Sequence, residues 1–159
     1  MKYNIALKYD KETTQEIFSI HKKLVDNLEV EHGINKKIFP HTTIVKFETQ
    51  EELSEAQQKT VIQDVNKEIK VDFSGITILP SYSGGYWVEI SVLKSKELID
   101  LQQNVLNNLK DYKILSGINN RFRPHITFAK TKTGNLNFEE LDYDILRKKK
   151  VVGKIEISK

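Results

Sequence analysis

The sequence predicts one domain of mixed strands and helices, built from a unit that occurs twice. Two segments carry this prediction: residues 40–46 read PHTTIVK and residues 124–130 read PHITFAK, with histidines His41 and His125 placed 84 positions apart. A strand, a helix and a loop precede each segment at nearly constant spacing, 38 residues in the first half and 39 in the second. At 159 residues the chain fits a single domain, 1–159, with two lobes that share a core.

The first half alternates apolar and polar residues at strand spacing, then repeats apolar residues at helical spacing. Asp10 is placed to cap the first helix, and Thr49-Gln50-Glu51-Glu52 has the form of a capping box for the second. The predicted elements are a strand over 3–9, a helix with apolar positions from 17 to 28, a loop, a strand over 41–47, a helix running to about 69 and a strand over 71–79.

The second half repeats this order after a turn over 80–85, which is rich in Pro, Ser and Gly. Its predicted elements are a strand over 86–93, a helix with apolar positions from 98 to 109, a loop, a strand over 125–131, a short helix over 138–146 and a closing strand over 151–157. We divide the lobes at roughly 1–80 and 81–159, and strand exchange between them stays open.

Composition excludes several classes of function. The chain has no cysteine, so it has neither disulfides nor thiolate chemistry, which suits a reducing compartment. It shows no signal peptide and no apolar run near the ~20 residues of a membrane span, so we expect a cytoplasmic protein without a membrane partner. The net charge of +3 tolerates an anionic ligand but is too small to indicate bulk nucleic-acid binding.

The repeated motif brings together the groups that phosphodiester chemistry needs. Residues two apart on a strand share a face, so His41 points with Thr43 and His125 with Thr127. In one cleft, one imidazole accepts a proton from the nucleophile and the other protonates the leaving oxygen, while the hydroxyls hold the non-bridging oxygens. We therefore predict these four residues as catalytic.

Strand alternation also sorts the neighbours of the motifs. It places Phe47 on the face of His41, so we predict that Phe47 lines the cleft. The same rule turns Lys46 and Lys130 away from the histidines and sends Phe128 into the core.

Four further residues are candidates for substrate binding. Tyr82, Tyr86 and Trp87 flank the glycine-rich turn, where they either stack on a base or ribose or pack the hairpin. Arg123 either reaches a phosphate or holds the loop before the second motif.

The remaining histidines carry no such context. We expect His21 on a helix surface and His32 in a loop. Neither motif has an H-x-x-x-H pattern or a cluster of carboxylates beside it, so we predict no metal and no cofactor.

With these motifs the sequence resembles the 2H phosphoesterases, which include the 2′-5′ RNA ligase-like proteins and the cyclic phosphodiesterases. The resemblance covers nearly the whole chain, with His41-Thr42-Thr43 and His125-Ile126-Thr127 as the two H-x-[ST] motifs. It implies an α+β, bilobal, duplicated fold in which two antiparallel sheets face a central cleft with helices outside. It also implies metal-independent catalysis, with His125 as the base and His41 as the acid.

The resemblance implies a nucleotide or oligonucleotide substrate: an RNA end, a 2′,3′-cyclic phosphate, a 2′-5′ oligonucleotide or a cyclic nucleotide. Our leading hypothesis is a monomeric phosphodiesterase. The alternatives are a module that binds a nucleotide or RNA end without turnover, and a 2′-5′ RNA ligase.

Overall fold

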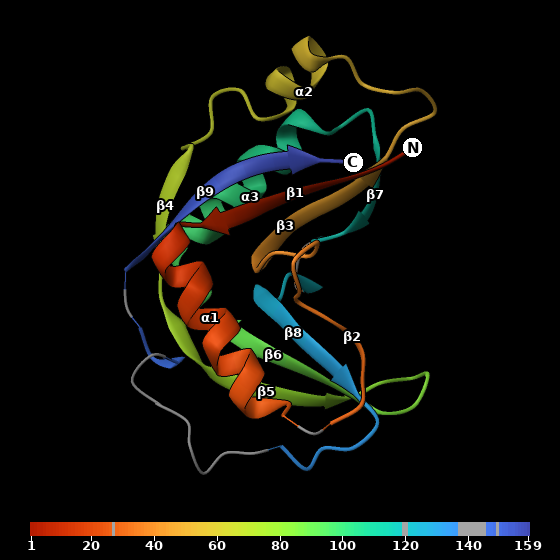
Figure 1. Ribbon diagram of the computed structural model, residues 1–159. Coiled ribbons are helices and arrows are strands. Elements are labelled where there is room, and N and C mark those ends of the chain that lie inside the picture. Colours follow the sequence, from red (N-terminus) through yellow and green to blue (C-terminus); the bar gives the residue numbers. More distant parts are fainter. Residues whose placement is uncertain (27, 119–120, 137–145, 149) are drawn as a thin grey trace.

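The computed structural model describes residues 1–26, 28–118, 121–136, 146–148 and 150–159, and it folds them into a strongly curved antiparallel sheet with three helices (Figure 1). In chain order the elements are β1 (Lys2–Tyr9), α1 (Lys11–Leu24), β2 (Val30–Gly33), β3 (His41–Glu48), α2 (Glu55–Val61), β4 (Glu68–Val71), β5 (Phe73–Pro80), β6 (Tyr86–Val92), α3 (Lys96–Asn108), β7 (Lys113–Ser116), β8 (His125–Thr131) and β9 (Val151–Ser158). None of the described helices is long and apolar enough to cross a membrane.

The two strands that begin with the motif histidines meet in the middle of the sheet. The strand order is β4-β9-β1-β3-β8-β6-β5, and β3 joins β8 through the single pair Thr42–Ile126. Figure 1 shows the two parts of the sheet bending away from each other at this point. The sequence predicts two facing sheets, whereas the described strands form one sheet that is continuous through this pair.

Each half of the chain sends a short strand to the other half's part of the sheet. β2 precedes β3 in sequence but pairs with β8, and β7 precedes β8 but pairs with β3. Helix α1 also lies against the other half's part of the sheet, as β2 does. The His21 ring of α1 packs edge-on against Phe128 of β8, with 5.2 Å between ring centroids. Both short strands fall in segments that the sequence predicts as loops.

Local capping fixes where the helices begin. The Asp10 side chain accepts a hydrogen bond from the Thr13 backbone N–H at 2.7 Å, as the sequence predicts. The capping box of α2 is formed by Ser54 and Gln57, so the box predicted at Thr49 is wrong. This helix ends at Val61, and residues 68–71 form β4 rather than its last turn. Most of the helix predicted over 138–146 lies outside the described residues.

The core lies between the helices and one face of the sheet. Ile5 and Leu7 of β1, Ile44 of β3 and Ile90 of β6 are all at most 1% exposed. The other face carries the polar residues of the same strands. The apolar layer therefore anchors the strands from behind, while the polar face is free to form a site.

Both motif strands contain a β-bulge directly after the threonine. In β3, Thr43 pairs with Ala6 and Val45 with Ile5, so Ile44 has no partner across β1. In β8, Thr127 pairs with Glu89 and Ala129 with Val88, which leaves Phe128 as the extra residue. A bulge inserts one residue and reverses which face the following side chains occupy.

A glycine from each short strand region packs on the opposite bulge. A Cβ on Gly33 would lie 2.8 Å from the Phe128 carbonyl oxygen, and one on Gly117 would overlap the carbonyl oxygen of Ile44. Gly117 also has φ +87°, which L side chains rarely adopt. Close backbone approach at these two points seats β2 and β7 against the motif strands.

Candidate functional site

The four predicted catalytic residues lie on one face of the sheet, on both sides of its central pair. Thr42 and Ile126 are fully buried on the core side, whereas His41, Thr43, His125 and Thr127 are half-buried on the other. Extending the antiparallel register by one residue on each side of this pair would set each histidine opposite the other strand's threonine. The two histidines are then diagonal neighbours, which regular sheet geometry separates by about 7–8 Å.

A matching backbone contact orients both imidazole rings. Nδ1 of His41 lies 2.8 Å from the carbonyl oxygen of Phe39, and Nδ1 of His125 lies 2.7 Å from that of Arg123. In each case the acceptor is two residues before the histidine. Since a carbonyl only accepts, Nδ1 carries the proton in both rings and Nε2 faces the site. This is the tautomer that leaves Nε2 available for proton transfer.

Buried groups behind the site hold the strands in place. The Tyr9 hydroxyl and Oγ1 of Thr42 form a hydrogen bond of 2.6 Å in the core. Burial raises the pKa of Tyr9 and keeps it neutral. The bond ties β1 to β3 at the residue between His41 and Thr43.

The bulges change which side chains share the face of the histidines. Phe47 is fully buried and stacks on Tyr3 with ring centroids 5.4 Å apart, so it belongs to the core and does not line the site. Lys46 and Lys130, which uniform alternation turns away, lie on the histidine face instead. Phe128 is in the core, as the sequence predicts. The error comes from counting strand positions without the inserted residue.

A carboxylate that the sequence reading did not single out lies beside the second motif. Glu89 of β6 is 3% exposed, pairs across the sheet with Thr127, and places Oε1 3.4 Å from Nε2 of His125. Both of its oxygens accept hydrogen bonds from the Arg123 guanidinium, which raises the pKa of Arg123. Arg123 is therefore engaged with a buried carboxylate. A signal was present in the sequence, since Glu89 alternates with Trp87 and Ser91 in a β-prone run.

The three aromatic candidates separate in the structure. Trp87 lies on the same face as Glu89, with the Lys130 ammonium 5.9 Å from its ring centroid and the His32 ring edge-on at 6.0 Å. Tyr86 occupies the opposite face of β6, and Tyr82 is fully exposed in the β5–β6 turn. Trp87 alone of the three adjoins the motif face. His32 lies on β2, not in a loop.

His21 is not a surface residue. Its ring packs on Phe128, and its Nε2 atom is buried without a hydrogen-bond partner among the described residues. Burial lowers the pKa of His21, because charging the ring there would strand a cation in apolar surroundings. It supports the back of the second motif strand.

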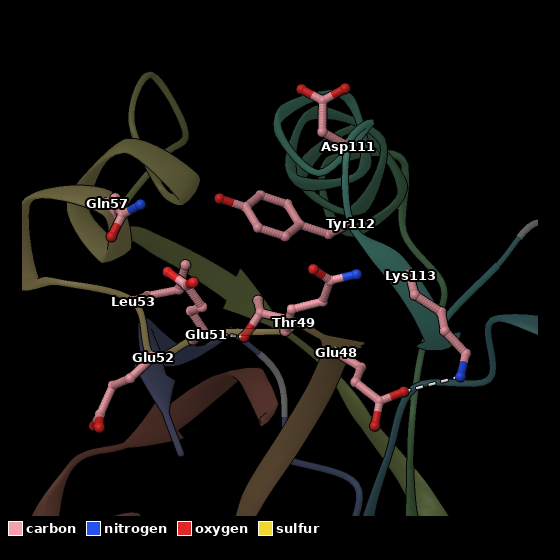
Figure 2. Close-up of a pocket in the computed structure, with 10 residues that line it drawn as sticks. Glu48, Thr49, Glu51, Glu52, Leu53, Gln57, Asp111, Tyr112 and Lys113 are labelled. Carbon is pink, nitrogen blue, oxygen red and sulfur yellow. Dashed lines mark hydrogen bonds and ion pairs between the residues drawn. The ribbon is translucent and has the colours of Figure 1, made fainter.

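Two hollows in the surface differ in their relation to the motifs. The larger, about 660 Å³, is lined by four carboxylates and the Tyr112 ring, with Lys113 turned toward Glu48 (Figure 2). Glu48 ends β3 seven residues after His41, roughly 20 Å along the strand. An acidic lining at that distance does not suit a phosphate site.

The smaller hollow, about 300 Å³, adjoins the second motif. Ser91, Arg123 and Pro124 contribute to its wall, and Ser91 pairs with His125 across the sheet. Leu79 of β5 and Phe122 from the loop before β8 supply apolar surface. This hollow therefore opens beside a motif histidine.

Comparison with known proteins gives a limited likeness. No protein-family model matches the sequence, and a comparison with curated proteins gives no significant match. Among solved structures, Usb1 from Kluyveromyces marxianus is similar at 16% identity and a TM-score of 0.46, over 87% of this chain and 74% of that one. The structure of the same protein with uridine monophosphate is similar at 14% identity and a TM-score of 0.46, over 91% and 75%. Values this low do not establish a shared function.

Proposed function

We propose that this chain is a metal-independent phosphodiesterase that acts on a nucleotide or RNA-end phosphodiester. The observation that carries the proposal is the pair Thr42–Ile126, which sets two His-x-Thr motifs side by side on one polar sheet face. A structural role for either motif alone would not require both imidazoles to hold the same tautomer toward the same face.

The arrangement supports a division of labour between the histidines. One Nε2 removes a proton from the attacking water or ribose hydroxyl, and the other supplies a proton to the departing oxygen. A phosphate that accepts one hydrogen bond from each histidine would span about the distance between diagonal neighbours in a sheet. Thr43 and Thr127 are placed to donate to the non-bridging oxygens, whose grip is most valuable in the transition state.

The surrounding face supports an anionic substrate that carries a nucleoside. Lys46 lies on it, Lys130 is paired there with Glu31 at 2.6 Å, and Trp87 offers a ring beside the second motif. The 300 Å³ hollow beside His125 offers apolar surface for one side of the diester. The repeat of the strand, helix, strand and strand order in the two halves supports the proposal of two similar lobes.

The test is a substrate panel in EDTA. The panel holds 2′,3′-cyclic mononucleotides, 3′-5′ cyclic mononucleotides, cyclic dinucleotides, 2′-5′ oligoadenylates and RNA with 2′,3′-cyclic phosphate ends. We expect release of a monophosphate or shortened oligonucleotide from at least one class, with loss of at least a hundredfold in His41→Ala. Lys113→Ala, on β7 beside the distant Glu48, is the control.

The other functions appear as distinct outcomes. Binding of a panel compound that both parent and His41→Ala retain, with no turnover by either, would indicate a binding module. Joining of a 2′,3′-cyclic end to a 5′-hydroxyl end would indicate a ligase. Activity that disappears in EDTA and returns with a divalent cation would refute the metal-independent mechanism.

A further inference from the structure

The near-symmetry of the two motifs breaks at the residues that pair with them on the outer neighbouring strands. Across the sheet from Thr43 stands Ala6, and across from Thr127 stands Glu89, each on the neighbouring strand at the point where the bulge begins. A methyl group therefore flanks the first motif where a buried carboxylate flanks the second. The neighbours of the histidines differ too, because Lys8 pairs with His41 and Ser91 with His125.

We propose that Glu89 is a positioning residue that assigns the proton-transfer roles, making His125 the general acid and His41 the general base. This inference rests on the proposed phosphodiesterase function and reverses the assignment that the family resemblance implies.

Both ring nitrogens of His125 face oxygen atoms. Its Nδ1 donates to the Arg123 carbonyl oxygen, and its Nε2 faces Oε1 of Glu89 at 3.4 Å. Both neighbours accept only, so a proton carried on Nε2 would face the Glu89 carboxylate. At 3.4 Å the contact is longer than a strong charge-assisted hydrogen bond. The proton stays available to a leaving oxygen.

The His41 ring differs from the His125 ring in its contacts. Its Nδ1 donates to the Phe39 carbonyl oxygen, and among the described residues its Nε2 faces no carboxylate at ion-pair distance, whereas that of His125 faces Glu89. The adjacent Lys8 is a cation, paired with Glu156 at 2.7 Å. A neutral ring with a bare Nε2 lone pair is what a general base requires.

Arg123 has a supporting part in this scheme. It donates to both Glu89 oxygens, which fixes the carboxylate in place. It also offsets the repulsion between Glu89 and an incoming phosphate. The charged and titratable groups around the site, taken by element, are Lys8 of β1, His41 and Lys46 of β3, Glu89 of β6, Lys94 and Arg123 of the loops, His125 and Lys130 of β8, and Glu156 of β9.

In the resulting reaction step, each bond formed is matched by a bond broken and each proton has a donor and an acceptor. His41 Nε2 takes the proton from the attacking oxygen as its bond to phosphorus forms. The bond from phosphorus to the leaving oxygen breaks, and that oxygen takes the proton from His125 Nε2. Exchange with water then moves one proton from His41 to solvent and returns one to His125, which restores the enzyme.

Glu89→Gln tests the assignment through the pH–rate profile, because it removes the charge and nearly keeps the shape. Without the carboxylate, the general acid gives up its proton at lower pH. The basic limb of the pH–rate profile, which reports this loss, is therefore expected to move to lower pH by on the order of 0.5–1 unit. The acidic limb, which reports the base, stays in place. Glu89→Asp keeps the charge and shifts the limb less. Glu48→Gln, which removes a carboxylate at the far end of β3, moves neither limb.

Movement of the acidic limb instead would make His125 the base and overturn the inference. A second measurement uses uridine 3′-(4-nitrophenyl phosphate), whose leaving group departs without a proton, against uridylyl-(3′-5′)-uridine. His125→Ala is expected to lose at least tenfold less activity on the nitrophenyl ester than on the dinucleotide, while His41→Ala loses similar activity on both. The opposite pattern also overturns the inference.

Failure of the proposed function is distinguishable from failure of this inference. NMR titration of the His125 ring needs no turnover and also reports whether Glu89→Gln is folded. If no panel substrate reacts but the His125 titration midpoint falls in Glu89→Gln, the proposed function fails and the Glu89 effect stands. If the midpoint does not move in a folded Glu89→Gln or Glu89→Asp protein, the inference fails whatever the activity.

Discussion

Exchanging two adjacent residues of β3 for neutral or smaller ones tests the bulge at Ile44 directly. Lys46 is exposed on the histidine face and Phe47 is fully buried behind it, so Lys46→Gln and Phe47→Leu should fail in opposite ways. Lys46 lies three residues, roughly 10 Å, along the strand from Thr43. One charge at that distance from a phosphate is worth about 0.4 kcal/mol in bulk water and more near a protein surface.

Lys46→Gln is therefore expected to raise KM roughly two- to fivefold at low salt, with kcat little changed. Screening should remove most of this effect at 0.5 M salt, where the Debye length falls well below 10 Å. Steady-state kinetics across a salt series with the best panel substrate measures it. Lys113→Gln is the matched control, because it removes the same charge from β7 beside the distant Glu48.

Phe47→Leu is expected to leave KM unchanged and to lower stability. It removes part of a buried ring and its stacking on Tyr3, which costs about 1–2 kcal/mol. For a chain of this size the midpoint of thermal unfolding then falls by roughly 2–8 °C. If Phe47→Leu raised KM without destabilising the fold while Lys46→Gln had no effect at low salt, β3 would have to run without the bulge.

Three further outcomes are expected. His41→Ala and His125→Ala should each remove most activity on substrates with poor leaving groups, and the double variant should be little worse than the worse single one, because the two act as a unit; additive losses in single-turnover assays would contradict this. Gly117→Ala should destabilise the fold more than Gly84→Ala, because both positions have positive φ but only the Cβ added at Gly117 would overlap a carbonyl oxygen. Equal losses of unfolding free energy in urea would contradict the close approach of Gly117 to β3. His21→Leu should lose less stability than the parent as pH falls. The pKa of His21 is lowered in the folded state, so the unfolded chain binds more protons below about pH 6.5 and parent stability drops there. A parent-minus-variant difference in unfolding temperature that stays constant from pH 7.5 to 5.5 would contradict it.

Much of the fold could be predicted because its signals are local. Alternating apolar residues and an Asp cap define β1 and α1, and the repeat of PHxT segments locates β3 and β8. β2 and β7 could not be found this way, since each has four residues that are largely exposed at an edge. Their pairing depends on partners far away in sequence, which periodicity does not report.

The position of the candidate site was predictable in its centre and not at its margins. His41 and His125 come from the repeat, and two-residue alternation suffices as far as the threonines. Beyond the threonines, the bulges reverse which face of the sheet the side chains occupy. The sequence around Ile44 and Phe128 carries no signal that these residues are inserted. Glu89 was missed for another reason, because a lone carboxylate in a strand gains meaning only when a neighbouring strand brings His125 to it.

The exchange of β2 and β7 across the sheet makes the two halves of the chain mutually dependent during synthesis. While the first half emerges, β2 has no β8 to pair with, and β1 waits for β9 from the end of the chain. Pairing between such distant segments makes folding slow. Cutting the exposed β5–β6 turn at Gly84 would likewise yield two fragments, each missing an edge strand and a covering helix. Such fragments would assemble only together, which makes this scaffold a natural candidate for a split protein whose activity reports the meeting of its pieces.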